Sequence, residues 1–205
     1  MRQRSVHIET NALSCERQGD DLGSDGDAMT DFFGPDEEVI IHRGMRSRGW
    51  IINSYAQVEY MLADAVLRCR SLPAYQHLPA TVPYQPSSRG PRFQAVLDAE
   101  GPIAEDRDDL QAVLDTFTAA ANRRHILVHG FCSVRVQMPV RVPLFHFIKL
   151  EPQPGKDDAV QTLILTIEDL EAIGEATSAD ATRALTVFQR LHRRMGWEAD
   201  GITKL

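Results

Sequence analysis

The sequence predicts a mainly α-helical protein, an antiparallel bundle of four to five helices with a small antiparallel β-hairpin or three-stranded sheet inserted before the last helix. Two observations lead to this fold class. Apolar residues recur every three or four positions in several long stretches, which is the period of a helix with one buried face. At about residues 131–166 this period gives way to alternation, which is typical of strands. We therefore expect one helical domain over residues 35–196 with its β insert at 131–166.

The chain outside that domain has a different composition. Residues 1–34 are rich in Gly, Ser and Asp around positions 19–27 and have little apolar periodicity, which predicts a disordered acidic arm. Residues 197–205 are expected to form a short C-terminal tail. Residues 1–38 hold three arginines and ten acidic side chains, a net charge of −7, whereas residues 39–195 hold 18 basic and 17 acidic side chains, a net charge of +1. The folded part is therefore nearly neutral and can carry a local basic site.

Composition narrows the class of protein. An apolar fraction of 43% and a charged fraction of 25% are those of an ordinary globular protein. No apolar run approaches the roughly 18 residues of a membrane span, and no signal-peptide segment opens the sequence. Cys15, Cys69 and Cys132 are widely spaced without a CxxC pair, which favours free thiols in a reducing compartment. We expect a cytoplasmic protein without a membrane partner.

The first predicted helix carries one charged residue on its apolar face. Pro35 and the three acidic residues after it are a helix-start signature, and helical character continues to about Arg70. The best core-facing series within it is Ile52, Tyr55, Glu59, Leu62 and Val66. Glu59 therefore either faces the core and needs a cationic partner, or lies at the edge of the series and faces water.

A second anomaly lies near the end of a later helix. After an irregular connection over 71–91 and a short helix at about 92–100, a long helix is expected from about Ala104 to His129, where Gly130 stops it. Its apolar series falls on Leu110, Val113, Leu114, Phe117, Ala120 and Ala121. Continued forward, the series reaches Arg124 or His125. Because an unpaired buried charge is very costly, we expect Glu59 to pair with Arg124.

The remaining elements follow from local signals. Alternation at residues 132–137, 142–148 and 160–165 predicts two or three antiparallel strands, with a turn at 152–157 joining the last two. Thr166 followed by Asp169 predicts a helix cap, and a final helix is expected over about 167–195. Its C-terminal end is basic. Basic residues there are explained first by the helix dipole, and only second by ligand binding.

The motif Arg124-His125-Ile126-Leu127-Val128-His129-Gly130, near the end of a late helix of a bundle, resembles that of the HEPN superfamily. The first helix with its inward Glu59 is also similar to the first core helix of that family, and the resemblance spans about residues 36–195. Most members carry Asn where this chain has His125. The resemblance implies a metal-independent endoribonuclease that cleaves RNA by attack of the 2′-hydroxyl. It also implies a homodimer formed through the motif helices, and a bacterial toxin or defence setting in which an antitoxin protein is a partner.

The resemblance also implies roles for individual residues. Arg124 would bind the phosphate, because a guanidinium can contact two phosphate oxygens at once. His129 would transfer a proton, and His125 would orient it, contact the phosphate or act as the second acid or base. Glu59 would hold Arg124 or a histidine in place. Asn122 and Arg123 are candidates for secondary contacts with the RNA.

The main alternative is a non-catalytic HEPN-like module for RNA or nucleotide binding, sensing or complex assembly. In that case Arg124, Glu59 and the histidines form a buried polar network that fixes helix register. Two histidines four residues apart also match a metal-ligand spacing, but the HExxH and ExxH motifs are missing. The Asp-rich stretch of the arm does not complete a calcium loop, and no GxSxG motif is present. We therefore expect neither a metal nor a cofactor.

Overall fold

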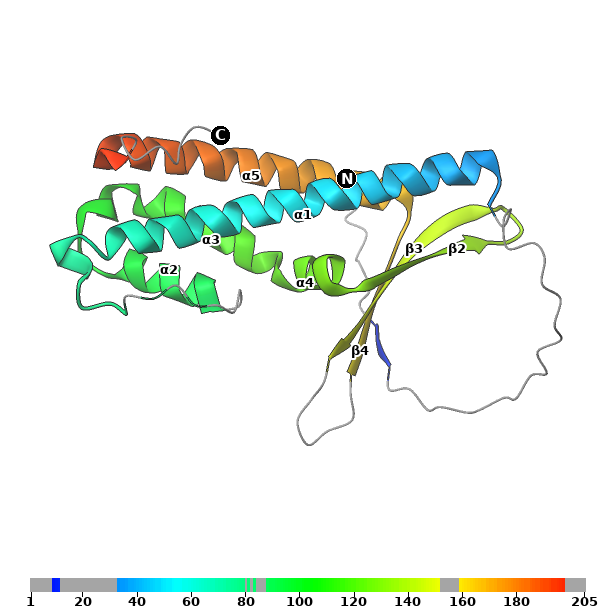
Figure 1. Cartoon of the computed structure of the whole chain (residues 1–205), viewed down its shortest axis with the longest axis horizontal. Coiled ribbons are helices and arrows are strands. Elements are labelled where there is room, and N and C mark those ends of the chain that lie inside the picture. Colours follow the sequence, from blue (N-terminus) through cyan, green and yellow to red (C-terminus); the bar gives the residue numbers. More distant parts are fainter. Residues whose placement is uncertain are drawn as a thin grey trace. The chain divides into compact units, whose positions relative to one another are not determined.

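The computed structural model describes residues 9–11, 33–79, 81, 83, 88–151 and 159–197 (Figure 1). The chain divides into two compact units. The first, which we call the sheet unit, takes residues 1–48 and 125–172, and the second, the bundle unit, takes residues 49–124 and 173–205. Within the described part of the chain, no helix is both long enough and apolar enough to cross a membrane.

The two longest helices agree with the sequence prediction. Helix α1 covers Pro35–Cys69 and α5 covers Ile167–Met195. The predicted cap of α5 is a reciprocal pair, in which the backbone N–H of Asp169 donates to Thr166 Oγ1 at 3.2 Å and the N–H of Thr166 donates to Asp169 Oδ2 at 3.1 Å. These bonds satisfy donors that a helix start otherwise leaves unpaired, so the cap prediction is confirmed.

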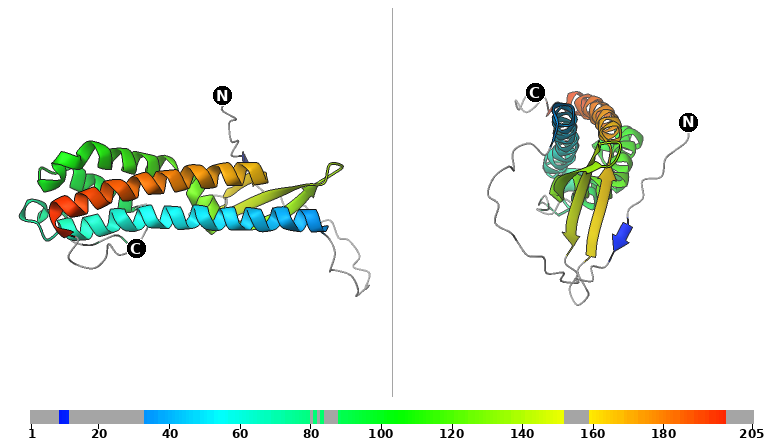
Figure 2. Two further views of the ribbon diagram at one scale, coloured as in Figure 1. Left: turned by 90° about the horizontal axis from the view of Figure 1, so that it is seen from above. Right: turned by 90° about the vertical axis from the view of Figure 1, so that its right-hand side faces the viewer.

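In the bundle unit, helices lie side by side around one apolar core (Figures 1 and 2). Its further elements are η1 (Pro73–Tyr75), α2 (Arg89–Asp98), η3 (Pro102–Asp106), α3 (Arg107–Ala119) and the beginning of α4 (Ala121–His129). Helix α2 starts three residues before the predicted position. The core includes Leu62, Val66, Phe93, Leu97, Leu110, Leu114, Phe188 and Leu191.

The prediction of one helix from Ala104 to His129 is wrong, because the structure divides this stretch into η3, α3 and α4. The interruption between α3 and α4 is a single residue, Ala120, with φ −84° and ψ −3°. One turn earlier, the Thr116 hydroxyl donates to the carbonyl oxygen of Ala112 at 2.9 Å. Such back-bonding by a threonine often bends a helix, and it is the local feature that accompanies the break. The helical spacing of buried positions nevertheless continues past Ala120, because Leu127 is buried and the Arg124 side chain is only 11% exposed.

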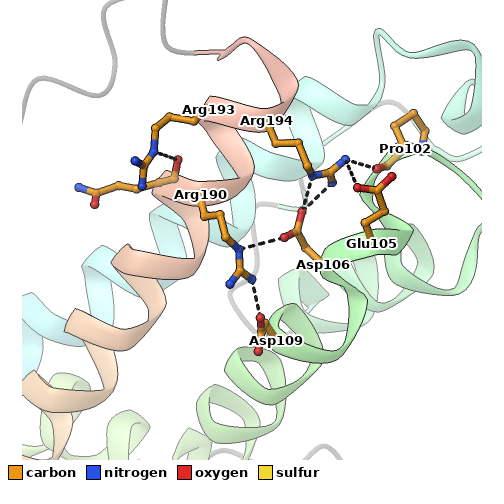
Figure 3. A network of polar contacts seen from close by, with 8 residues as sticks. Pro102, Glu105, Asp106, Asp109, Arg190, Arg193 and Arg194 are labelled. Atoms are coloured by element: carbon orange, nitrogen blue, oxygen red, sulfur yellow. Dashed lines mark hydrogen bonds and ion pairs between the residues drawn. The ribbon is translucent and has the colours of Figure 1, made fainter.

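The basic end of α5 is held by acidic residues at the start of α3 (Figure 3). Asp106, whose side chain is 7% exposed, accepts hydrogen bonds from Arg190 at 3.1 Å and from Arg194 at 2.6 Å. Arg190 also binds Asp109, and Arg194 donates to the carbonyl oxygen of Pro102 at 2.8 Å. The basic cluster predicted at this helix end is therefore bound within the bundle unit.

The sheet unit contains four antiparallel strands in the order β1-β4-β3-β2. Three of them are the predicted insert: β2 (Phe131–Gln137), β3 (Val142–Glu151) and β4 (Ala159–Leu165). Strand β1 (Glu9–Asn11) pairs with β4, although it lies in the range predicted as a disordered arm. The rest of that arm before residue 33, the predicted turn at 152–157 and the tail after Trp197 lie outside the described residues.

The sheet packs against the first part of α1. Phe145 and Phe147 of β3 are fully buried, and a Cβ atom added at Gly44 would overlap the ring of Phe145. The guanidinium of Arg48, one turn further along α1, lies 5.3 Å from the centroid of the Phe147 ring. Gly44 is thus required in α1 by close approach of the sheet, at the expense of helix propensity.

Two glycines of α1 give a matched test of this packing. Gly44→Ala should lower the free energy of unfolding by about 1–2 kcal/mol, because the added methyl group overlaps a ring that has no room to move. Gly49→Ala should raise it by roughly 0.5–1 kcal/mol, because nothing lies within 4 Å and alanine favours the helix. Urea unfolding curves measure both changes, and shifts in the same direction would contradict this packing.

Asp106 and Asp109 form a second matched pair. Asp106→Asn should lower the free energy of unfolding by about 1–2 kcal/mol, because it removes a buried charge shared by two arginines. Asp109→Asn should cost less than about 0.5 kcal/mol, because this side chain is 57% exposed and its ion pair is screened by water. The midpoints of urea unfolding curves, compared at equal m-values, show which variant is less stable. An equal loss of stability in the two variants would show that burial of Asp106 does not matter.

Candidate functional site

The C-terminal end of α4 is fixed by a glycine and an arginine. The N–H of Gly130 donates to the carbonyl oxygen of Ile126 at 2.8 Å, and a Cβ atom at position 130 would overlap that same oxygen. Arg48 Nε donates to the carbonyl oxygen of Leu127 at 2.9 Å, and its Nη2 donates to that of Gly130 at 3.1 Å. A cation at this end satisfies carbonyl groups that a helix leaves unpaired. Sequence reasoning predicted the stop at Gly130 but missed Arg48.

The two histidines of the motif are exposed neighbours on α4. Their ring centroids are 4.9 Å apart with the planes at 67°, an edge-to-face contact between His125 and His129. Ile126 and Leu127 take the buried positions instead, with exposed fractions of 1% and 0%. Of the two positions predicted for the continued apolar series, Arg124 or His125, the structure selects Arg124, whose side chain is 11% exposed, and the series goes on to the buried Leu127. Both imidazoles are therefore exposed to solvent on α4.

A carboxylate of β3 lies within electrostatic reach of the histidine pair. Glu151 accepts hydrogen bonds from Lys149 Nζ at 2.7 Å and from Gln161 Nε2 at 2.6 Å. The bond from Lys149 is the main reason why the pKa of Glu151 is lowered from its ordinary value, and the charge of His125 lowers it further. Sequence reasoning did not find Glu151, because only the pairing of the inserted strands brings it to this place.

Within the bundle unit, Glu59 binds two arginines. Its Oε2 lies 3.3 Å from Arg124 Nη1, and its Oε1 lies 2.8 Å from Arg89 Nη1. The side chains of Glu59 and Arg124 are 16% and 11% exposed. The guanidinium of Arg124 also lies 4.5 Å from the centroid of the Phe117 ring, a cation–π distance. The predicted pairing of Glu59 with Arg124 is confirmed, and the alternative of a water-facing Glu59 is wrong. Arg89 of α2 was not predicted.

The two residues predicted to make secondary contacts precede Arg124 on α4. Asn122 is exposed. Arg123 is half-buried, and in the described part of the chain its Nε atom is buried without a hydrogen-bond partner. Contacts of either residue with RNA stay a prediction.

The structure thus brings the predicted site residues together in two groups. Glu59 meets Arg124 in the bundle unit, and His125 meets His129 in the sheet unit. Helix α4 carries Arg124 and both histidines. Among the described residues, no three His, Cys, Asp or Glu side chains gather where they could hold a metal ion.

Comparisons of the chain with models of protein families, with curated proteins and with solved structures gave no match. What the α4 residues do is therefore inferred from their geometry and from the motif itself.

Glu59 provides a direct test of the bundle-unit contacts. Glu59→Gln should lower the free energy of unfolding by about 2–3 kcal/mol, because it leaves the largely buried guanidinium of Arg124 without a counter-charge. Arg89→Gln should cost less, about 1 kcal/mol or below, since Arg89 is 27% exposed and Glu59 keeps Arg124 as a partner. Chemical unfolding of both variants measures the difference. If Glu59→Gln is as stable as the unchanged protein, the buried pair does not contribute as described.

Proposed function

We propose that this protein is a metal-independent endoribonuclease whose acid–base pair is His125 and His129. The observation that carries the proposal is the contact between two exposed imidazoles at the C-terminal end of α4. Imidazole is the side chain that gains and loses protons near neutral pH. Two of them side by side can accept one proton and donate another in a single reaction.

The chemistry follows from that pair. One imidazole takes the proton of a ribose 2′-hydroxyl, whose oxygen then forms a bond to the adjacent phosphorus. The bond from phosphorus to the 5′-oxygen breaks, and the second imidazole, which starts protonated, gives its proton to that oxygen. The products are a 2′,3′-cyclic phosphate and a 5′-hydroxyl end, and no metal takes part. His129 is assigned proton transfer by the motif, and His125 is its partner.

Arg124 is proposed to stabilise the charge on the phosphate. A guanidinium has five N–H donors, and the contact with Glu59 is made through Nη1. In this proposal Glu59 positions Arg124 and does not itself contact RNA. The charge of His125 lowers the pKa of Glu151, and we propose that the Glu151 carboxylate in turn favours the protonated form of that imidazole. The motif also leads us to propose a homodimer formed through the α4 helices, in a toxin or defence setting with an antitoxin partner.

A non-catalytic module is the second candidate, and a specific observation favours it. Arg124 is already engaged by Glu59 and by the face of Phe117, with only 11% of its side chain exposed. An arginine held in this way can serve to fix the register of α1, α2 and α4 in the bundle unit. In this reading the exposed histidines bind RNA or a nucleotide without cutting it.

The test compares RNA cleavage by purified full-length variants in EDTA. The unchanged protein should cleave a labelled RNA pool and leave 2′,3′-cyclic ends, and it should spare the same pool with 2′-O-methyl ribose. His129→Gln and His125→Gln should each lose at least about 100-fold in rate, since a positioned acid or base contributes on that scale. Both histidines are exposed, so neither change should lower the free energy of unfolding appreciably.

The matched control is His42→Gln, an exposed histidine of α1 that should leave the rate unchanged. Arg124→Lys keeps the charge but loses the planar fork, and should slow cleavage while retaining most of the stability. Absence of cleavage with every RNA, together with tight RNA binding that needs His125 and His129, would replace the enzyme with the non-catalytic module. Cleavage that stops in EDTA would also contradict the proposal.

A further inference from the structure

The bundle unit contains a partly open cavity of about 200 Å³ between α1, α3 and α5. These helices lie side by side in both figures of the fold (Figures 1 and 2). Most of the wall is apolar, formed by Val58, Ala112, Val113, Phe117, Ala120, Ala184 and Val187. The core around it is closely packed, so a hollow of this size is a departure from ordinary packing density.

One polar atom in the wall has no partner. The hydroxyl of Tyr55 is buried without a hydrogen bond in the described part of the chain, and Tyr55 as a whole is only 6% exposed. Buried hydroxyl groups are nearly always satisfied, because leaving one unpaired costs about 1–3 kcal/mol. Tyr55 is itself one of the lining residues, so its hydroxyl is an unused donor beside the cavity.

The other hydroxyl groups of the wall are already engaged. Thr116 donates to the carbonyl oxygen of Ala112 at 2.9 Å, and Thr177 donates to that of Ile173 at 2.7 Å. Tyr55 is thus the hydroxyl that remains to recognise a polar group inside this cavity.

The charges along the wall select against anions. Asp109 and Asp180 line the cavity together with Arg183, and Arg183 forms an ion pair with Asp180. Asp109 is bound by Arg190, which is outside the lining. Both carboxylates of the lining are thus neutralised by guanidinium groups, and an anion entering the cavity would lose its hydration without meeting an unpaired cation among the described lining residues.

We propose that this cavity is a binding site for a small uncharged molecule with one apolar ring and one hydrogen-bond acceptor. The acceptor would accept a hydrogen bond from the Tyr55 hydroxyl. The size agrees, because an apolar cavity of about 150 Å³ is known to hold benzene, and a ring with a short carbonyl substituent needs little more. The site is separate from the histidine pair of α4. It shares Phe117 with the contact of Arg124, whose guanidinium lies over that ring.

Three probes of similar size and different polarity test the site: acetophenone, ethylbenzene and benzoate. Each probe is titrated into the full-length protein, and NMR of the methyl groups of Val113 and Val187 follows binding. Acetophenone should bind saturably, and ethylbenzene should bind more weakly. Benzoate should not bind, because its carboxylate would lose its hydration without meeting an unpaired cation of the described lining. Tyr55→Phe should weaken acetophenone about fivefold, the value of one net hydrogen bond, and leave ethylbenzene unchanged.

A variant that fills the cavity, and a control with the same substitution elsewhere on α3, locate the bound probe. Ala112 is an exposed part of the lining, so Ala112→Phe should fill the cavity and abolish binding of both neutral probes. Ala119→Phe adds the same ring at an exposed position of α3 outside the lining and should bind like the unchanged protein. Tyr55→Phe should fold at least as stably as the unchanged protein, since it removes an unsatisfied buried group.

Two results would overturn the proposal. Binding of acetophenone that survives in both Tyr55→Phe and Ala112→Phe would place the probe elsewhere. If no probe binds, and sedimentation shows a dimer that Ala112→Phe dissociates but Ala119→Phe does not, the cavity receives a side chain from a second copy of the chain.

Discussion

The bundle unit depends on one carboxylate. Glu59 lies in α1 with 16% of its side chain exposed, and it binds Arg89 of α2 and Arg124 of α4. A charge at that depth is costly unless it is paired, so helices α1, α2 and α4 must meet at Glu59 for its carboxylate to be accommodated. Phe117 of α3 completes the arrangement by contacting the Arg124 guanidinium with its ring. The polar contact thus sets the register that the apolar core around it then fills.

A second constraint operates in the sheet unit, at the end of α4. Gly130 is there because no side chain fits beside the carbonyl oxygen of Ile126, and Arg48 binds the carbonyl groups that the helix end leaves unpaired. The chain turns directly into β2 and the three-stranded insert. Strand β3 then brings Lys149 and Glu151 to the neighbourhood of His125. The insert therefore supplies charged side chains near the histidine pair. In the proposed reaction, its Glu151 would favour protonation of His125.

The parts of the fold that the sequence predicted are those with strong local signals. Helices α1 and α5, the Thr166–Asp169 cap and the three strands of the insert follow from periodicity, capping residues and alternation. The prediction failed where a long helix was extended through Ala120. The interruption there is a single residue, and the apolar series does not reveal it, because Arg124 and Leu127 keep their places in that series. Identity with the HEPN superfamily, an RNA substrate and a homodimer are still predictions from the motif.

By itself the sequence determined the two longest helices and the strands of the insert, and that Glu59 and Arg124 need each other, because periodicity reveals which charged residues lie on apolar faces. It also marked Arg124, His125 and His129 as candidate site residues. Only the tertiary structure decided that the histidines contact each other at the surface and that Arg89 forms a second ion pair with Glu59. It also decided that Glu151 interacts electrostatically with His125. It alone showed that Tyr55 lines a cavity and that its buried hydroxyl has no hydrogen-bond partner in the described part of the chain. The physical reason is that these contacts join residues far apart in the chain, whose meeting depends on how helices and strands pack and not on any local pattern.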